Sequence, residues 1–136
     1  MNWKLIFLLS LVGAAMAVLT VSVIPSTVEP IIWLAIFFGY AWIITNRVPK
    51  GKYFLHAFLV SVLNGVWIGL IHAALHDTYL ANHVDEAKQF ANTPWGDSAT
   101  SMIWMGPIFG AIFGVISGLI SMLVGKVRKS KAATTA

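Results

Sequence analysis

The segment Leu5–Ile24, LIFLLSLVGAAMAVLTVSVI, decides the fold class, because its twenty residues include no charged side chain. A helix rises about 1.5 Å per residue, so a segment of this length covers about 30 Å, the thickness of the hydrocarbon core of a bilayer. A helix in a soluble bundle would carry a polar stripe facing water, and this segment carries none. The segment therefore predicts a membrane-spanning helix.

Three further apolar segments have a similar length, at about 28–46, 53–76 and 101–125. Unpaired backbone polar groups are costly in lipid, so each segment is expected to be helical. The composition agrees, since 58% of the 136 residues are hydrophobic and only 10% are charged, whereas a soluble domain carries about 25% charge. The sequence therefore predicts an all-α fold, an integral membrane four-helix bundle that forms a single domain over residues 1–131, with a disordered tail at 132–136.

The charged residues are sorted between the two sides of the predicted membrane. Eight of the nine Lys and Arg residues precede the first span, separate the second from the third, or follow the fourth, whereas all five acidic residues lie in the other two connections. Basic residues near span ends stay on the cytoplasmic side, so both termini are predicted to be cytoplasmic by this positive-inside rule. Topology in the inner (plasma) membrane thus explains the net charge of +4. The expected partner is the lipid bilayer, and no nucleic acid is expected.

The absence of cysteine excludes disulfides, thiolate metal ligands and cysteine nucleophiles. Processing of the N-terminus stays open. Lys4, the apolar residues after it and Ala15-Met16-Ala17 have the pattern of a signal peptide with a small-residue cleavage site, although the apolar run continues unbroken to Ile24. Residues 1–17 are therefore either the start of the first span or a cleaved leader, and Glu29 is predicted to lie outside in both cases.

The outer loop at 77–100 is the one sizeable segment predicted outside the bilayer. Four of its apolar residues recur with helical spacing: Leu80, Val84, Ala87 and Ala91. This pattern predicts a short amphipathic helix, which either lies on the outer membrane surface or continues the third span. Residues 92–96 are expected to break the chain, so that Asp97 or Ser98 caps the fourth helix.

The third and fourth spans carry glycines at every fourth residue, the pattern of a glycine zipper. These are Gly106, Gly110, Gly114 and Gly118 in the fourth span, and Gly65 and Gly69 in the third. Helices associate in lipid through close backbone approach, which such bare faces permit. The glycines are therefore predicted to be helix-packing residues. They pack either the fourth span against the first or third span of the same chain, or this chain against a second copy or another membrane subunit.

The third span alone carries several strongly polar side chains, and Asn64, His72 and His76 fall on one broad face of it. Polar groups at membrane depth often mark functional sites, which makes these three the candidate polar site. His72 and His76 are close enough to share a metal or pass a proton. Zinc and iron sites need three or four ligands, so no metal site and no cofactor are expected. Asn64 either bonds a neighbouring helix or lines a path for a solute.

Four stretches carry a resemblance to a known family: 54–58 (FLHAF), 64–72 (NGVWIGLIH), 77–83 (DTYLANH) and 106–110 (GPIFG). Together they resemble a family of small four-span bacterial membrane proteins of unknown function that is common in Bacteroidetes. The resemblance covers about Tyr53–Gly125. It implies a bacterial inner-membrane protein and implies no activity.

Two functions are consistent with the sequence. The glycine pattern and the lack of buried charge favour a non-enzymatic protein that packs as an accessory subunit of a larger membrane assembly. The alternative is a small transporter or channel for an ion or small solute, using the polar residues of the third span. An enzyme is not expected, because no span contains a nucleophile–base pair or a carboxylate dyad.

Overall fold

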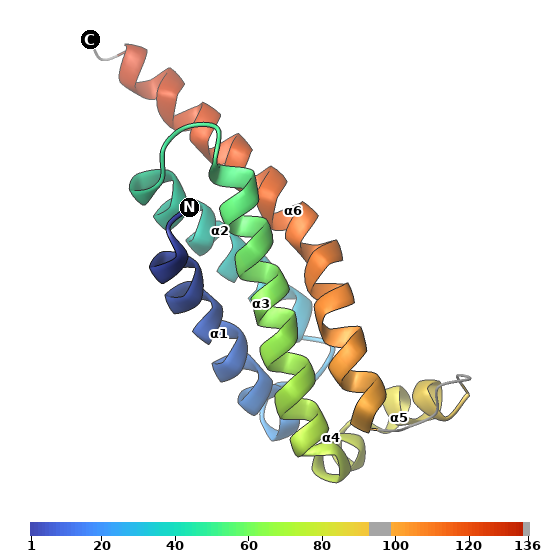
Figure 1. Ribbon diagram of the computed structural model, residues 1–136. Coiled ribbons are helices and arrows are strands. Elements are labelled where there is room, and N and C mark those ends of the chain that lie inside the picture. Colours follow the sequence, from blue (N-terminus) through green and yellow to red (C-terminus); the bar gives the residue numbers. More distant parts are fainter. Residues whose placement is uncertain (93–98, 135–136) are drawn as a thin grey trace.

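A computed structural model describes residues 1–92 and 99–134. Within these ranges the chain forms six helices and no strand (Figure 1). Four helices are long and two are short: α1 (Trp3–Ser22), α2 (Glu29–Arg47), α3 (Tyr53–Ala74), α4 (His76–Asn82), α5 (Val84–Ala91) and α6 (Ala99–Thr134). The four long helices, α1, α2, α3 and α6, are long and apolar enough to cross a membrane. The predicted all-helical class and the four candidate spans are thus confirmed.

The helix boundaries lie within a few residues of the predicted ones, except at the end of α6. The first helix begins early because the Asn2 side chain accepts a hydrogen bond from the amide of Leu5 at 3.1 Å and so caps it. The last helix continues to Thr134, through the first three residues of the predicted disordered tail. Alanine and lysine are frequent in this stretch, and both are strong helix formers. Residues 135 and 136 lie outside the described residues.

The two ends of the bundle differ in charge. The N-terminus, the turn between α2 and α3 and the C-terminal part of α6 lie at one end, which holds eight of the nine basic residues and is called the basic end here (Figure 1). The turn between α1 and α2, together with α4 and α5, lies at the opposite end, called the acidic end. Four of the five acidic residues belong to it, and the fifth, Asp97, lies outside the described residues.

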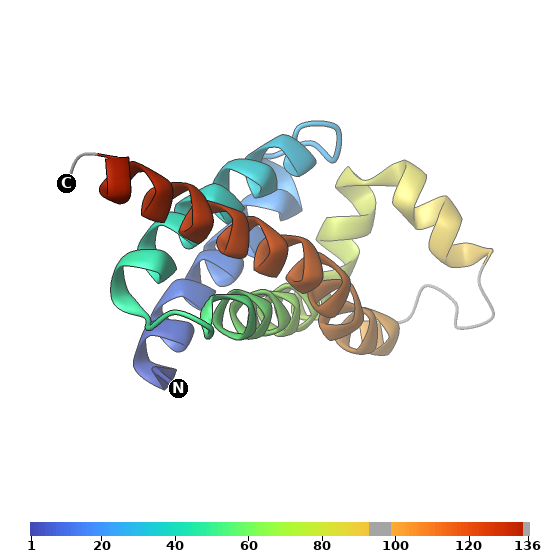
Figure 2. The ribbon, with the colours of Figure 1, turned by 90° about the horizontal axis from the view of Figure 1, so that it is seen from above.

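Helix α3 is the centre of the bundle. It lies between α1 and α6, and α2 packs mainly on α6 and only slightly on α3 (Figure 2). The largest buried apolar cluster occupies the half of the bundle near the basic end, where Ile6 of α1, Ile44 of α2 and Val60 of α3 meet. A smaller pocket of about 270 Å³ lies at this end, beside the turn between α2 and α3. The other half, where α2 diverges from α3, contains the cavity described below.

The glycines of α6 face α3 of the same chain. A Cβ atom added at Gly106 would meet the carbonyl oxygen of Gly65, and one added at Gly110 would lie 2.7 Å from the carbonyl oxygen of Ser61. Further along, Gly114 faces Phe58, Gly118 faces Phe54, and Gly69 faces the backbone of Met102. Only residues without a side chain allow this approach. The sequence left open which helix packs against these glycines, and in the structure it is α3 of the same chain.

Two short helices replace the single amphipathic helix predicted in the outer loop. The chain leaves helical geometry at His83, whose ring is buried and stacks on Tyr79 with centroids 4.3 Å apart. Before this break, the Asn82 amide donates to the carbonyl oxygen of Val21 at 3.0 Å and ties α4 to the end of α1. Of the break predicted at 92–96, residues 93–96 lie outside the described residues, as do the predicted caps Asp97 and Ser98.

Arg128 joins α6 to the end of α2. Its guanidinium donates to Thr45 Oγ1 at 3.1 Å and to Asn46 Oδ1 at 2.6 Å. It also lies 4.6 Å above the ring of Trp42. An arginine can make all three contacts at once because its donors are coplanar and its flat face can stack.

Candidate ligand-binding cavity

Helices α1 and α3 are joined by a row of polar contacts that runs along most of their length. Near the basic end, the backbone N–H of Asn2 donates to His56 Nε2 (3.1 Å) and Trp67 Nε1 donates to Ser10 Oγ (3.2 Å). Toward the acidic end, the backbone N–H of Gly13 donates to Asn64 Oδ1 (3.2 Å), and Thr20 Oγ1 bonds His72 Nε2 (2.9 Å). Polar groups removed from water need such partners. Two residues of the predicted polar site, Asn64 and His72, are therefore engaged with α1.

Asn64 connects three helices. Its side chain is 3% exposed. Besides accepting from the Gly13 amide, it donates through Nδ2 to the Tyr40 hydroxyl at 3.1 Å, and that hydroxyl donates to the carbonyl oxygen of Leu9 at 3.1 Å. A Cβ at Gly13 would lie 2.6 Å from Asn64 Oδ1. The close approach of the Asn64 side chain to α1 therefore requires glycine at position 13.

His72 and His76 have separate partners. His72 bonds Thr20, and its ring stacks on Tyr79 with centroids 4.2 Å apart, so that His72, Tyr79 and His83 form a stack of three rings. His76 instead pairs with Asp77, with 3.0 Å between Nδ1 and Oδ1. Among the described residues, no three His, Asp or Glu side chains gather in a group that could hold a metal ion.

A cavity of about 540 Å³ lies between α2, α3 and α6 in the half of the bundle near the acidic end. Six large apolar side chains contribute to its wall: Trp33, Phe37, Met102, Met105, Phe109 and Phe113. The α3 wall is more polar and includes Ser61, Asn64 and His72. A pocket of this size, mainly apolar with a few polar groups, is typical of small-molecule sites, which have volumes of about 300–1,000 Å³.

Ser61 belongs to the α3 wall, in the part of this cavity nearer the basic end. The side chain is 2% exposed and its oxygen has no hydrogen-bond partner among the described residues. A buried hydroxyl without a partner costs about 1–3 kcal/mol. The Ser61 oxygen is itself buried, as are the equally unpaired hydroxyl oxygens of Ser117 and Ser121 in α6, so the missing partner is not a feature of the cavity alone.

Two carboxylates border the mouth of the cavity at the acidic end. Glu29 is the first residue of α2, and its Oε1 accepts a hydrogen bond from Trp33 Nε1 at 3.0 Å. Glu86 comes from α5. Both act on Tyr79, which also borders the cavity: burial, together with the negative charges of Glu86 and Glu29, raises the pKa of Tyr79 to about 12. No lysine or arginine is found among the described residues that line the cavity.

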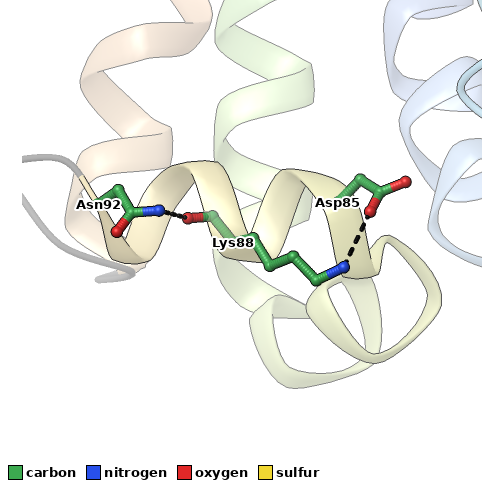
Figure 3. Close-up of polar contacts among 3 residues, drawn as sticks. All are labelled: Asp85, Lys88 and Asn92. Carbon is green, nitrogen blue, oxygen red and sulfur yellow. Dashed lines mark hydrogen bonds and ion pairs between the residues drawn. The ribbon is translucent and has the colours of Figure 1, made fainter.

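The remaining charges of α5 lie on its exposed side. Lys88 pairs with Asp85 at 3.2 Å, and both side chains are largely exposed (Figure 3). The Lys88 carbonyl oxygen accepts a hydrogen bond from Asn92 Nδ2 at 2.9 Å, which ends the helix. The only basic residue of the acidic end is thus held away from the cavity.

Sequence reasoning identified Asn64 and His72, which both border the cavity, but it missed the aromatic wall and the pair of glutamates. Glu29 and Glu86 lie in different loops of the sequence, and no local pattern connects them. The one available signal was the spacing of Glu29 and Trp33, which places a carboxylate and an indole on the same side of the first turn of a helix.

The helices and the cavity define an all-helical protein with four candidate membrane spans and a ligand-sized cavity between three of them. Comparison with known proteins gives no match to a protein-family model, a curated protein or a solved structure.

Proposed function

We propose that this chain is a non-enzymatic, multi-pass protein of the bacterial inner membrane that binds a small amphipathic molecule in its cavity. The observation that carries the proposal is the cavity of about 540 Å³, whose wall combines large apolar side chains with polar groups of α3. In the proposed orientation the basic end faces the cytoplasm, because it holds eight of the nine basic residues. The mouth of the cavity then faces outward.

The composition of the wall supports binding of a molecule with an apolar body. Met102 and Met105 have flexible side chains that adapt to irregular ligands. The aromatic side chains offer large rigid surfaces, which bind at little entropic cost.

The packing at the basic end favours a binding site over an open channel. Phe37 borders the cavity and also belongs to the buried cluster of Ile6, Ile44 and Val60, which fills the bundle beyond it. Asn64 and His72, the groups expected to line a solute path, are bonded to α1. A carrier would have to open this cluster, whereas a binding protein would not.

The accessory subunit favoured by the sequence is the second candidate. Its main support was the glycine pattern, and Gly106 and Gly110 contact α3 of the same chain. An interface with another subunit would therefore have to use the outer faces of the helices. Their exposed apolar side chains, such as Ile31, Leu34 and Trp42 of α2, are also what a lipid-facing surface requires.

Binding of the neutral fluorescent probe N-phenyl-1-naphthylamine to the protein in lipid nanodiscs tests the proposal. We expect a saturable signal of one probe per chain above that of empty nanodiscs. Met105→Trp should abolish this signal, because it fills the cavity from the α6 wall. Ile112→Trp places the same side chain on the same helix at a position that is 54% exposed and outside the cavity, and it should leave the signal unchanged. Absence of a saturable signal in the wild type, or its retention by Met105→Trp, would overturn the proposal.

A further inference from the structure

The mouth of the cavity carries two negative charges and no positive one. Glu29 and Glu86 enter it from α2 and α5, and both are partly buried. The titratable groups around them are Tyr79 and the two histidines that stack on its ring, His72 and His83. Tyr79 does not offset them, because a phenol is neutral when protonated and negative when ionised.

The nearest basic side chain is committed elsewhere. Lys88 lies on α5, as Glu86 does, but it pairs with Asp85 on the exposed side of the helix (Figure 3). Two carboxylates on the wall of one cavity, with no lysine or arginine among the described lining residues, give this end a negative potential. The mouth is therefore an attractive site for a positive group.

The interior of the cavity adds a second requirement, because it is apolar over most of its wall. Aromatic rings such as Trp33 and Phe109 bury hydrophobic groups and attract cations through their faces. The indole N–H of Trp33 also fixes the Glu29 carboxylate at 3.0 Å, next to the aromatic wall.

We propose that the cavity selects amphipathic cations. The positive group, such as a quaternary ammonium, a phosphonium or a protonated amine, lies at the mouth between Glu29 and Glu86. The apolar part extends past Trp33 toward Ser61. This inference rests on the proposed function, and it adds the charge of the ligand and the two residues that attract this charge.

Two ions of nearly the same size and shape but opposite charge provide the test. Saturable binding of radiolabelled tetraphenylphosphonium and tetraphenylborate is measured on the purified protein in a neutral detergent. We expect tetraphenylphosphonium to bind at least about tenfold more tightly than tetraphenylborate, because the mouth attracts one ion and repels the other. Raising the ionic strength should narrow this difference, since the mouth is open to solvent.

Substitutions of the two glutamates test whether their charges cause the preference for tetraphenylphosphonium. Glu29→Gln and Glu86→Gln should each weaken tetraphenylphosphonium binding by about fivefold, a typical size for one charge at a partly exposed site. Glu29→Asp keeps the charge and should retain most of the affinity, which separates loss of charge from loss of fold. Asp85→Asn removes a carboxylate from the exposed side of α5 and should have no effect.

The outcomes separate the two proposals. Equal binding of both ions, or unchanged tetraphenylphosphonium affinity in Glu29→Gln and Glu86→Gln, would overturn the cation preference and leave the cavity as a binding site. Binding of the neutral probe without binding of tetraphenylphosphonium would have the same consequence. Failure of both ions and of the neutral probe to bind would overturn the proposed function as well.

Discussion

Replacing Gly110 by alanine tests how closely α6 packs on α3. An added Cβ would lie 2.7 Å from the carbonyl oxygen of Ser61 and 3.1 Å from Cα of Val62, whereas ordinary contact begins at 3.4 Å. Both neighbouring atoms belong to the α3 backbone and cannot rotate away. The two helices must therefore separate by several tenths of an ångström, and overpacking of this kind costs about 1–3 kcal/mol.

Gly39 in α2 provides a matched control, because a Cβ there would meet nothing within 4 Å. Both substitutions gain the helix propensity of alanine over glycine, about 1 kcal/mol. The difference between the two variants therefore isolates the cost of packing. In thermal unfolding followed by circular dichroism in a mild detergent, we expect Gly39→Ala to raise the Tm. Gly110→Ala should melt about 3–10 °C below Gly39→Ala.

Two further glycines extend the comparison to a graded series. A Cβ at Gly118 would meet the ring of Phe54, which can move, whereas one at Gly106 would meet a carbonyl oxygen of α3 more closely than at Gly110. The Tm of the alanine variants should fall in the order Gly39, Gly118, Gly110, Gly106. The same Tm for Gly39→Ala and Gly110→Ala would show that α3 and α6 are not in backbone contact.

Three other predictions concern polar groups. Asn64→Leu should lower the free energy of unfolding by about 1 kcal/mol, because it removes the hydrogen bond to Tyr40 and the one that reaches α1. Arg128→Lys should lower it by about 1 kcal/mol or less, since lysine cannot bond two acceptors and stack on Trp42 at once. In a spectrophotometric titration, the component lost in Tyr79→Phe should have its midpoint near pH 12 instead of 10. Because the folded-state pKa is the higher one, the stability that this group contributes is complete below pH 10 and is lost as the pH rises toward 12.

Each of these predictions has a control. The effect of Asn64→Leu should shrink in a Tyr40→Phe background, and full additivity would argue against their hydrogen bond. For Arg128→Lys the comparison is Arg47→Lys, at an exposed arginine of the same end, and equal losses would speak against the specific contacts with α2. A Tyr79 midpoint at pH 10 would contradict both its burial and its nearness to the two glutamates.

The sequence predicted the elements well but could not predict the spaces between them. The span at Leu5–Ile24 was visible because the signal is local and depends only on length and apolarity. The glycines at 106–118 indicated close packing, but a bare helix face is complementary to many others, so their partner had to come from the structure. The break at His83 was also missed, because the apolar spacing continues across it. The stack of His83 on Tyr79 gave no sign of this break, because rings four residues apart are also neighbours in a continuous helix.

The cavity could not be predicted from the sequence, because it depends on how the helices pack against one another. It forms where α2 leans on α6 and diverges from α3, and such an angle between helices is not encoded in any single segment. Asn64 attracted attention as a polar residue in an apolar span. In the structure it braces the cavity wall by joining α1, α2 and α3.

The central position of α3 has a consequence for how the protein is assembled during synthesis. Helix α6 is made after the other helices, yet it is the main neighbour of α3 and supplies one wall of the cavity. Before α6 packs, α1 and α3 can already be joined by the bonds of Asn64 and His72, while the faces of Gly65 and Gly69 are still uncovered. The polar contacts can thus hold α1 and α3 together first, and the closing of the glycine faces is the step that completes the wall of the cavity.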